Sequence, residues 1–165
     1  MNGTGLGTVG PILTGGFIIT RKSGGPGVAL IDRVPASPRL KVVSACIGPI
    51  STKKALRSKD LRRRVNVLGQ EAFRSIVRDL RPHNFMTASK KFAYGLGLMS
   101  PQTLRLIEVM EAAGAIGATQ NMLGQAVHAI ADEDLARSVL AAVKRRFPSV
   151  QAFSCSLDFA GARLL

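Results

Sequence analysis

Hydrophobic and polar positions change their period along the chain, and the first third has the pattern of short strands. Runs rich in β-branched and other apolar residues are separated by glycine- and proline-containing turns, of which residues 23–27 form the clearest. This pattern predicts strands over residues 17–20, 28–33 and 40–47.

From residue 61 the apolar positions recur at steps of three and four, which is the spacing of one face of a helix. The first such stripe comprises Leu61, Val65, Leu68, Ala72, Ile76 and Leu80. It predicts a helix over residues 61–80, with Asp60 as its N-cap and its arginines directed away from the stripe. Two more helices are predicted, one over residues 84–96 and one that begins at Pro101 after a Ser100 cap.

The last third returns to strands around one more helix. Residues 127–130 have a strand pattern, and residues 133–146 follow with helical spacing after Asp132. Two closing strands are predicted at 150–155 and 160–165. Strands, then helices, then a strand–helix–strand ending predict an α+β fold with helices on one face of a mainly antiparallel sheet.

The formal net charge is +13, and residues 51–91 hold twelve Lys or Arg against three acidic residues. A field of this sign attracts anions such as phosphates, carboxylates or nucleic acids. No aromatic residue is interleaved with the charges over residues 51–72, so the pattern does not favour a nucleic-acid partner. A solvated helix face and a cleft for a small acidic ligand are both compatible with it.

The composition, 46% hydrophobic and 20% charged, is that of a globular protein. No apolar run is long enough to cross a bilayer, so we expect no membrane segment. Cys46 and Cys155 stand alone, which is typical of a reducing cytosol and favours a cytoplasmic protein. His83 and His128 have no carboxylate or thiol at ligand spacing, so we interpret both as structural and predict no protein-bound metal from them.

The first sixteen residues contain six glycines, and residues 5–10 match GxGxxG by letter. A dinucleotide site needs a strand before this motif and a helix after it. Only four residues precede the match, and Pro11 with Gly15 and Gly16 leaves no room for a long helix, so we reject a Rossmann site. Two interpretations are left, a flexible glycine-rich segment and a backbone that passes close to a ligand.

Several blocks, taken in order, resemble one family. They are Gly5-Leu6-Gly7-Thr8-Val9, Gly15-Gly16, Gly25-Pro26-Gly27, Val34, Thr52-Lys53 with Leu56, Arg64-Val65-Asn66 with Gly69, Met86, Ser89, Phe92-Ala93, Gly97-Leu98 and Met122-Leu123-Gly124. Each block is short, but their order and spacing over residues 3–130 resemble those of the archaeal pantoate kinases, a branch of the GHMP kinase superfamily.

The resemblance implies a fold and an activity. GHMP kinases use ATP and magnesium to phosphorylate a small alcohol, and a pantoate kinase acts on a hydroxyl of pantoate in coenzyme A biosynthesis. The fold implied for residues 49–165 is the ferredoxin-like α+β C-terminal domain of the superfamily. Residues 1–48 then correspond to a glycine-rich β segment of its N-terminal domain, and the implied partner is a small acidic, pantoate-like metabolite.

The resemblance also implies site residues. Those implied for substrate binding are Gly5, Gly7, Thr20, Arg21, Lys53 and Arg64, and those implied for cofactor binding are Gly117 and Gly124, left from the superfamily's third glycine-rich motif. Thr8 occupies the position of the family's catalytic Asp, and Thr20 that of an Arg for the pantoate carboxylate. A threonine cannot accept a proton at neutral pH, and Arg21 would point to the other face of its strand from Thr20.

The phosphate loop of the family lies upstream of every block found in this chain, and three hypotheses follow. In the first, these residues are the C-terminal part of a kinase that is inactive without an N-terminal half encoded upstream. In the second, they form a degenerate paralogue that binds an acidic metabolite or a protein partner without catalysis. In the third, which we favour least, the basic segment binds nucleic acid. We also expect an exposed apolar surface that pairs with the other half or forms a homodimer.

Overall fold

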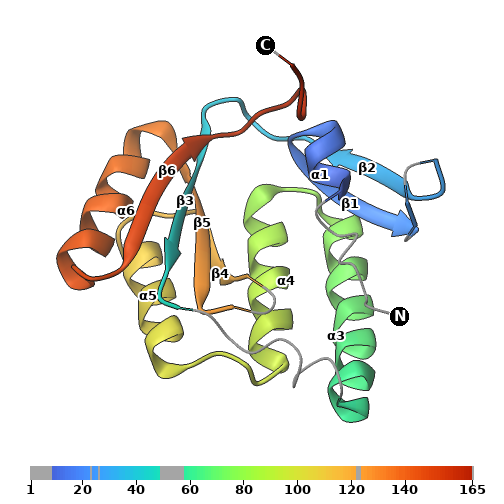
Figure 1. The fold of residues 1–165 in the computed structure, drawn as a ribbon, viewed down its shortest axis with the longest axis horizontal. Coiled ribbons are helices and arrows are strands. Elements are labelled where there is room, and N and C mark those ends of the chain that lie inside the picture. Colours follow the sequence, from blue (N-terminus) through green and yellow to red (C-terminus); the bar gives the residue numbers. More distant parts are fainter. Residues whose placement is uncertain (1–8, 23, 26, 49–57, 122–123, 165) are drawn as a thin grey trace. The chain divides into compact units, whose positions relative to one another are not determined.

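The computed structural model describes residues 9–22, 24–25, 27–48, 58–121 and 124–164 (Figure 1). Two compact units make up the chain, one of residues 1–38 with 156–165 and the other of residues 39–155. Strand β3 (Leu40–Cys46) groups with the second unit. The domain boundary after residue 48 stays a prediction.

The first unit is built on a two-stranded antiparallel sheet, in which β1 (Phe17–Lys22) pairs with β2 (Leu30–Val34). The short helix α1 (Val9–Thr14) precedes β1. A Cβ on Gly10 would lie 2.8 Å from a side-chain carbon of Ile18 and 2.9 Å from one of Ile31. The glycine therefore allows α1 to lie directly against one face of the hairpin.

The described residues 157–164 form no strand, so the strand predicted over 160–165 is wrong. The carboxylate of Asp158 accepts a hydrogen bond from the backbone N–H of Ala160 at 2.6 Å, which turns the chain at this point. The carbonyl of Asp158 in turn accepts from the N–H of Gly16 at 2.6 Å. The aspartate thus gives the backbone local partners in place of a strand ladder.

The second unit contains a four-stranded sheet in the order β4–β5–β3–β6 (Figure 1). After β3 its elements are α3 (Lys59–Arg78), α4 (Pro82–Gly95), α5 (Pro101–Ala112), β4 (Gly117–Gln120), β5 (Ala126–Asp132), α6 (Glu133–Arg146) and β6 (Gln151–Ser156). β5 pairs antiparallel with both β3 and β4. This is the β-α-β-β-α-β order of a ferredoxin-like fold with α3 and α4 added before α5, so the predicted α+β class is confirmed.

Helices α5 and α6 cover one face of this sheet and enclose the main core (Figure 1). The core includes Leu106, Ile107 and Met110 of α5, Val139 and Val143 of α6, and Val43, Val127 and Ala129 of the strands. Helix α4 packs along β4, and α3 packs on α4. Among the described residues, no helix combines the length and apolar character that a membrane crossing requires.

Local chemistry sets the helix ends. Ser100 Oγ accepts a hydrogen bond from the N–H of Thr103 at 3.1 Å and Pro101 opens α5, as predicted. The N-cap of α3 is Ser58, whose Oγ accepts a backbone N–H, so the assignment of Asp60 as the cap is wrong. Asp60 lies in the first turn instead, where its charge favours the helix N-terminus.

Candidate functional site

Part of the predicted site lies outside the described residues. These candidates are Gly5, Gly7, Thr8 and Lys53. Their roles stay predictions from the resemblance. The candidates that the structure does describe are Thr20 and Arg21 in the first unit, and Arg64, Gly117 and Gly124 in the second.

Thr20 and Arg21 are both exposed on β1 but face in different directions. Thr20 stands opposite Ile31 in the hairpin register, on the face against which α1 lies. Arg21 forms an ion pair with Asp32, with 3.1 Å between Nη1 and Oδ2, and Asp32 stands opposite Ile19. Arg21 is thus paired with Asp32 in this structure, and its role in substrate binding stays a prediction.

Arg64 uses its guanidinium within the fold. Its Nη2 donates to the carbonyl of Gly95 at 2.5 Å, at the C-terminal end of α4. A cation at this place complements the partial negative charge of a helix C-terminus. Arg64 thus joins α3 to α4, and a substrate would have to compete with this contact.

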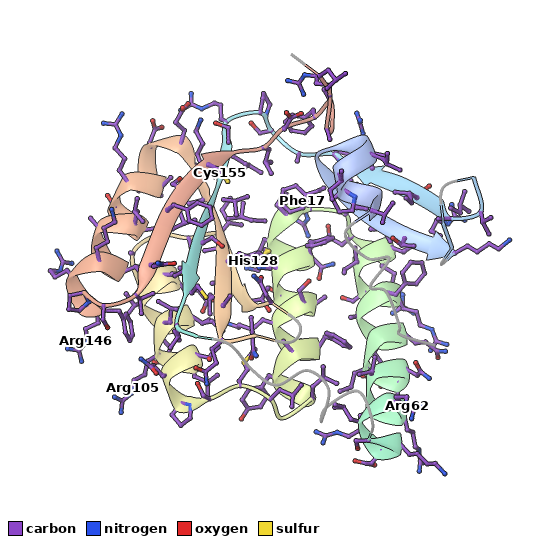
Figure 2. The ribbon with its side chains drawn as sticks, viewed as in Figure 1. Phe17, Arg62, Arg105, His128, Arg146 and Cys155 are labelled. Carbon is purple, nitrogen blue, oxygen red and sulfur yellow. The ribbon has the colours of Figure 1, made fainter. Side chains whose placement is uncertain are left out.

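The other arginines of α3 are exposed, as the helical pattern predicts. Arg62, Arg63, Arg74 and Arg78 all lie outside the half-buried stripe, and Figure 2 shows Arg62 directed away from the body of the second unit. Leu80, which was predicted within the stripe, follows the helix and is 40% exposed. The outer side of α3 is therefore a solvated cationic surface that attracts anions.

Gly117 is buried in β4, directly under α4. A Cβ at this position would lie 2.5 Å from Cβ of Met86. The missing side chain allows the helix to approach the strand closely. The protein itself fills the space beside this glycine.

Gly124 lies in the connection between β4 and β5, beside several polar side chains. Gln120 Nε2 donates to the carbonyl of Gly124 at 2.8 Å, whereas Gln120 Oε1 is buried and has no partner in the described part of the chain. Nearby, His128 Nδ1 contacts Asn121 Oδ1. Burial lowers the pKa of His128, so its imidazole is neutral at neutral pH.

A nucleotide phosphate needs backbone N–H groups that converge on it and carry no other bond. The N–H of Gly124 donates to Asn121 O at 3.2 Å, and that of Gln125 to Gly48 O at 3.3 Å. Magnesium needs oxygen ligands, and the residues that the structure describes bring together no group of three or more His, Cys or acidic side chains suited to a metal. The described part of this connection does not fit an ATP–magnesium complex by itself.

Curated relatives connect this geometry to one family. Over 142 residues the chain is 24% identical to the pantoate kinase of Methanocaldococcus jannaschii. This matched segment makes up 86% of this chain and 51% of the relative. Over 130 residues it is 26% identical to the pantoate kinase of Thermococcus kodakarensis, and the match makes up 79% of this chain and 43% of that relative. The chain resembles archaeal pantoate kinases along most of its length. It spans about half the length of these relatives, and no protein-family model matches it.

Solved structures share the fold. A phosphotransferase related to the CoA biosynthesis pathway superposes with a TM-score of 0.80 at 19% identity, covering 90% of this chain and 48% of its own. MDDEF in complex with MVAPP, AMPPCP and magnesium superposes with a TM-score of 0.69 at 11% identity. The superposition covers 93% of this chain and 56% of that structure's chain. The structural neighbours are GHMP kinases, of which this fold makes up about half.

The polar side chains around the β4–β5 connection were missed in the sequence. Residues 114–125 have no clear helical or strand pattern, and His128 was interpreted as structural. Thr119, Gln120 and Asn121 are three consecutive polar residues. The alternation expected of a strand with one polar face is therefore absent, and no local pattern signalled the site.

Proposed function

We propose that this chain supplies one half of a pantoate kinase-like phosphotransferase, and that its residues alone do not catalyse the transfer. One observation carries the proposal: the similarity to two archaeal pantoate kinases extends over 86% and 79% of this chain but only 51% and 43% of theirs. The ferredoxin-like second unit, with its match to a CoA-pathway phosphotransferase, supports the same assignment.

In the proposed reaction, the γ-phosphoryl group of ATP passes to a hydroxyl of pantoate, with magnesium as the metal cofactor. The positive field of the chain attracts the anionic substrate. Two substitutions weaken the chemistry, because Thr8 replaces an implied general base and Thr20 an implied partner of the carboxylate. The nucleotide would be held by the other half, since the described part of the β4–β5 connection does not fit it.

Mixing two purified proteins tests the proposal: this chain, and the N-terminal half of the Methanocaldococcus jannaschii pantoate kinase. We expect slow, pantoate-dependent release of ADP from the mixture that neither protein shows alone. Mixtures without pantoate and with either protein omitted are the controls. A complex that forms in sedimentation experiments but releases no ADP would contradict the catalytic assignment.

A second candidate is a non-catalytic protein that binds an acidic metabolite, and the replacement of the implied Asp by Thr8 favours it. Calorimetry that detects pantoate binding, together with no turnover in any pairing, would support this candidate. Its protein partner would be the other half or a second copy, through exposed apolar residues such as Phe153 on β6, which is 60% exposed. Sedimentation of the chain alone separates a homodimer from a monomer.

A further inference from the structure

Three polar side chains stand side by side on neighbouring strands of the second unit. His128 on β5 is directly opposite Ser44 on β3 and directly opposite Thr119 on β4. Residues next to them, Val43 and Val127 among others, face the core under α5 and α6. Because side chains alternate along a strand, the row Ser44–His128–Thr119 lies on the opposite face of the sheet, which Gly117 shares and on which α4 packs.

The imidazole of His128 contacts one amide side chain beside this row. Asn121 lies two residues after Thr119, and its Oδ1 meets His128 Nδ1. With Asn121 Oδ1 as the acceptor, Nδ1 carries the proton and Nε2 of the neutral ring presents a lone pair. No described side chain bonds to this Nε2.

The row also contains hydroxyl groups without partners. Thr119 is 2% exposed, and its Oγ1 is buried with no hydrogen-bond partner in the described part of the chain. Ser44 is half-buried and has no side-chain hydrogen bond to any residue that the structure describes. A buried polar group without a partner costs about 1–3 kcal/mol, so a row with this much unused bonding capacity indicates a place for a polar ligand.

We propose that the row Ser44–His128–Thr119 is a binding site for a hydroxyl group of a small hydroxy compound. A hydroxyl donates one hydrogen bond and accepts others, so it can donate to His128 Nε2 and accept from a serine or threonine hydroxyl. A carboxylate cannot donate to Nε2. An ammonium group could, but a chain of net charge +13 repels cations.

This site does not depend on phosphotransfer. Where the proposed function also holds, the bound hydroxyl belongs to the pantoate-like acid. The row would then act as a positioning element for the substrate, since it contains no group suited to hold the phosphate.

Nuclear magnetic resonance of the ring signals tests the site, because the chain has two histidines and only one lies in the row. Three probes separate the chemical groups: pantoate has hydroxyls and a carboxylate, pantolactone keeps a hydroxyl without the carboxylate, and pivalate has the carboxylate alone. We expect pantoate and pantolactone to shift the His128 ring signals in a saturable manner. Pivalate should leave them unchanged, and His83, exposed at the start of α4, should not respond to any probe.

The Ser44→Ala variant provides the matched test within the row, because it removes one hydroxyl from a half-buried position. We expect it to weaken pantolactone binding by about five-fold or more, the worth of one hydrogen bond. Unchanged His128 signals with all three probes, or equal shifts with pivalate, would overturn the proposal. Saturable pantolactone binding by a chain that never supports ADP release would leave the site standing and reject the kinase assignment.

Discussion

The Thr8→Asp variant, paired with the N-terminal half of the Methanocaldococcus jannaschii pantoate kinase, should turn over pantoate about 10²–10⁴-fold faster than the unaltered chain in the same pairing. The physical reason is the proton of the attacking hydroxyl. A carboxylate can accept it or orient the hydroxyl, whereas a threonine hydroxyl does not accept a proton at neutral pH. Initial rates of ADP release at saturating ATP measure the effect.

Thr8→Asn is the control for this substitution, because asparagine has nearly the shape of aspartate but no basic oxygen at neutral pH. Its rate should stay near that of the unaltered chain. Equal gains with Asp and Asn would show that shape, and not proton acceptance, limits the reaction. No gain with either variant, in a pairing that forms a complex, would favour the non-catalytic candidate.

The Gly117→Ala variant should lose about 1–3 kcal/mol of stability, the usual cost of forcing an extra carbon into a filled core. The added Cβ would lie 2.5 Å from Cβ of Met86, and both atoms are close to the backbone, so α4 or β4 must move. Urea denaturation followed by circular dichroism measures the change in the free energy of unfolding.

Gly124→Ala is the matched control, because the nearest atom to its added Cβ, among the described residues beyond its chain neighbours, would be 3.8 Å away. It should change stability by less than about 0.5 kcal/mol. The double variant Gly117→Ala with Met86→Gly should be more stable than the sum of its single variants predicts, since the loss of Met86 Cβ removes the atom that the added carbon meets. Equal stability of the Gly117 and Gly124 variants would contradict the packing account.

Where local chemistry decides an element, the sequence was enough to predict it. The Ser100–Pro101 start of α5 and the strand–helix–strand ending β5–α6–β6 appear as expected. The errors arose where two local options compete. Ser58 caps α3 although Asp60 is an equally good cap by type, and the Asp158 turn replaces a strand over an apolar stretch.

The candidate site depended on pairings that no local pattern contains. That Ser44, His128 and Thr119 share one row follows from the register of three strands, which residues far apart in the chain must set together. That a Cβ at Gly117 would meet Met86 depends on how α4 packs on β4. By contrast, the different directions of Thr20 and Arg21 were predicted from strand alternation, and the structure keeps them although the β1–β2 register shifts between Thr20 and Lys22.

Phosphate transfer by the purified chain alone is the most direct test of the central claim, which is that these residues form the framework of a phosphotransferase without its complete chemistry. With ATP, magnesium and pantoate present, phosphorus NMR should detect no more phosphopantoate than in a mixture without protein. Formation of phosphopantoate by the unaided chain at a rate typical of kinases, on the order of 1 per second, would contradict the account.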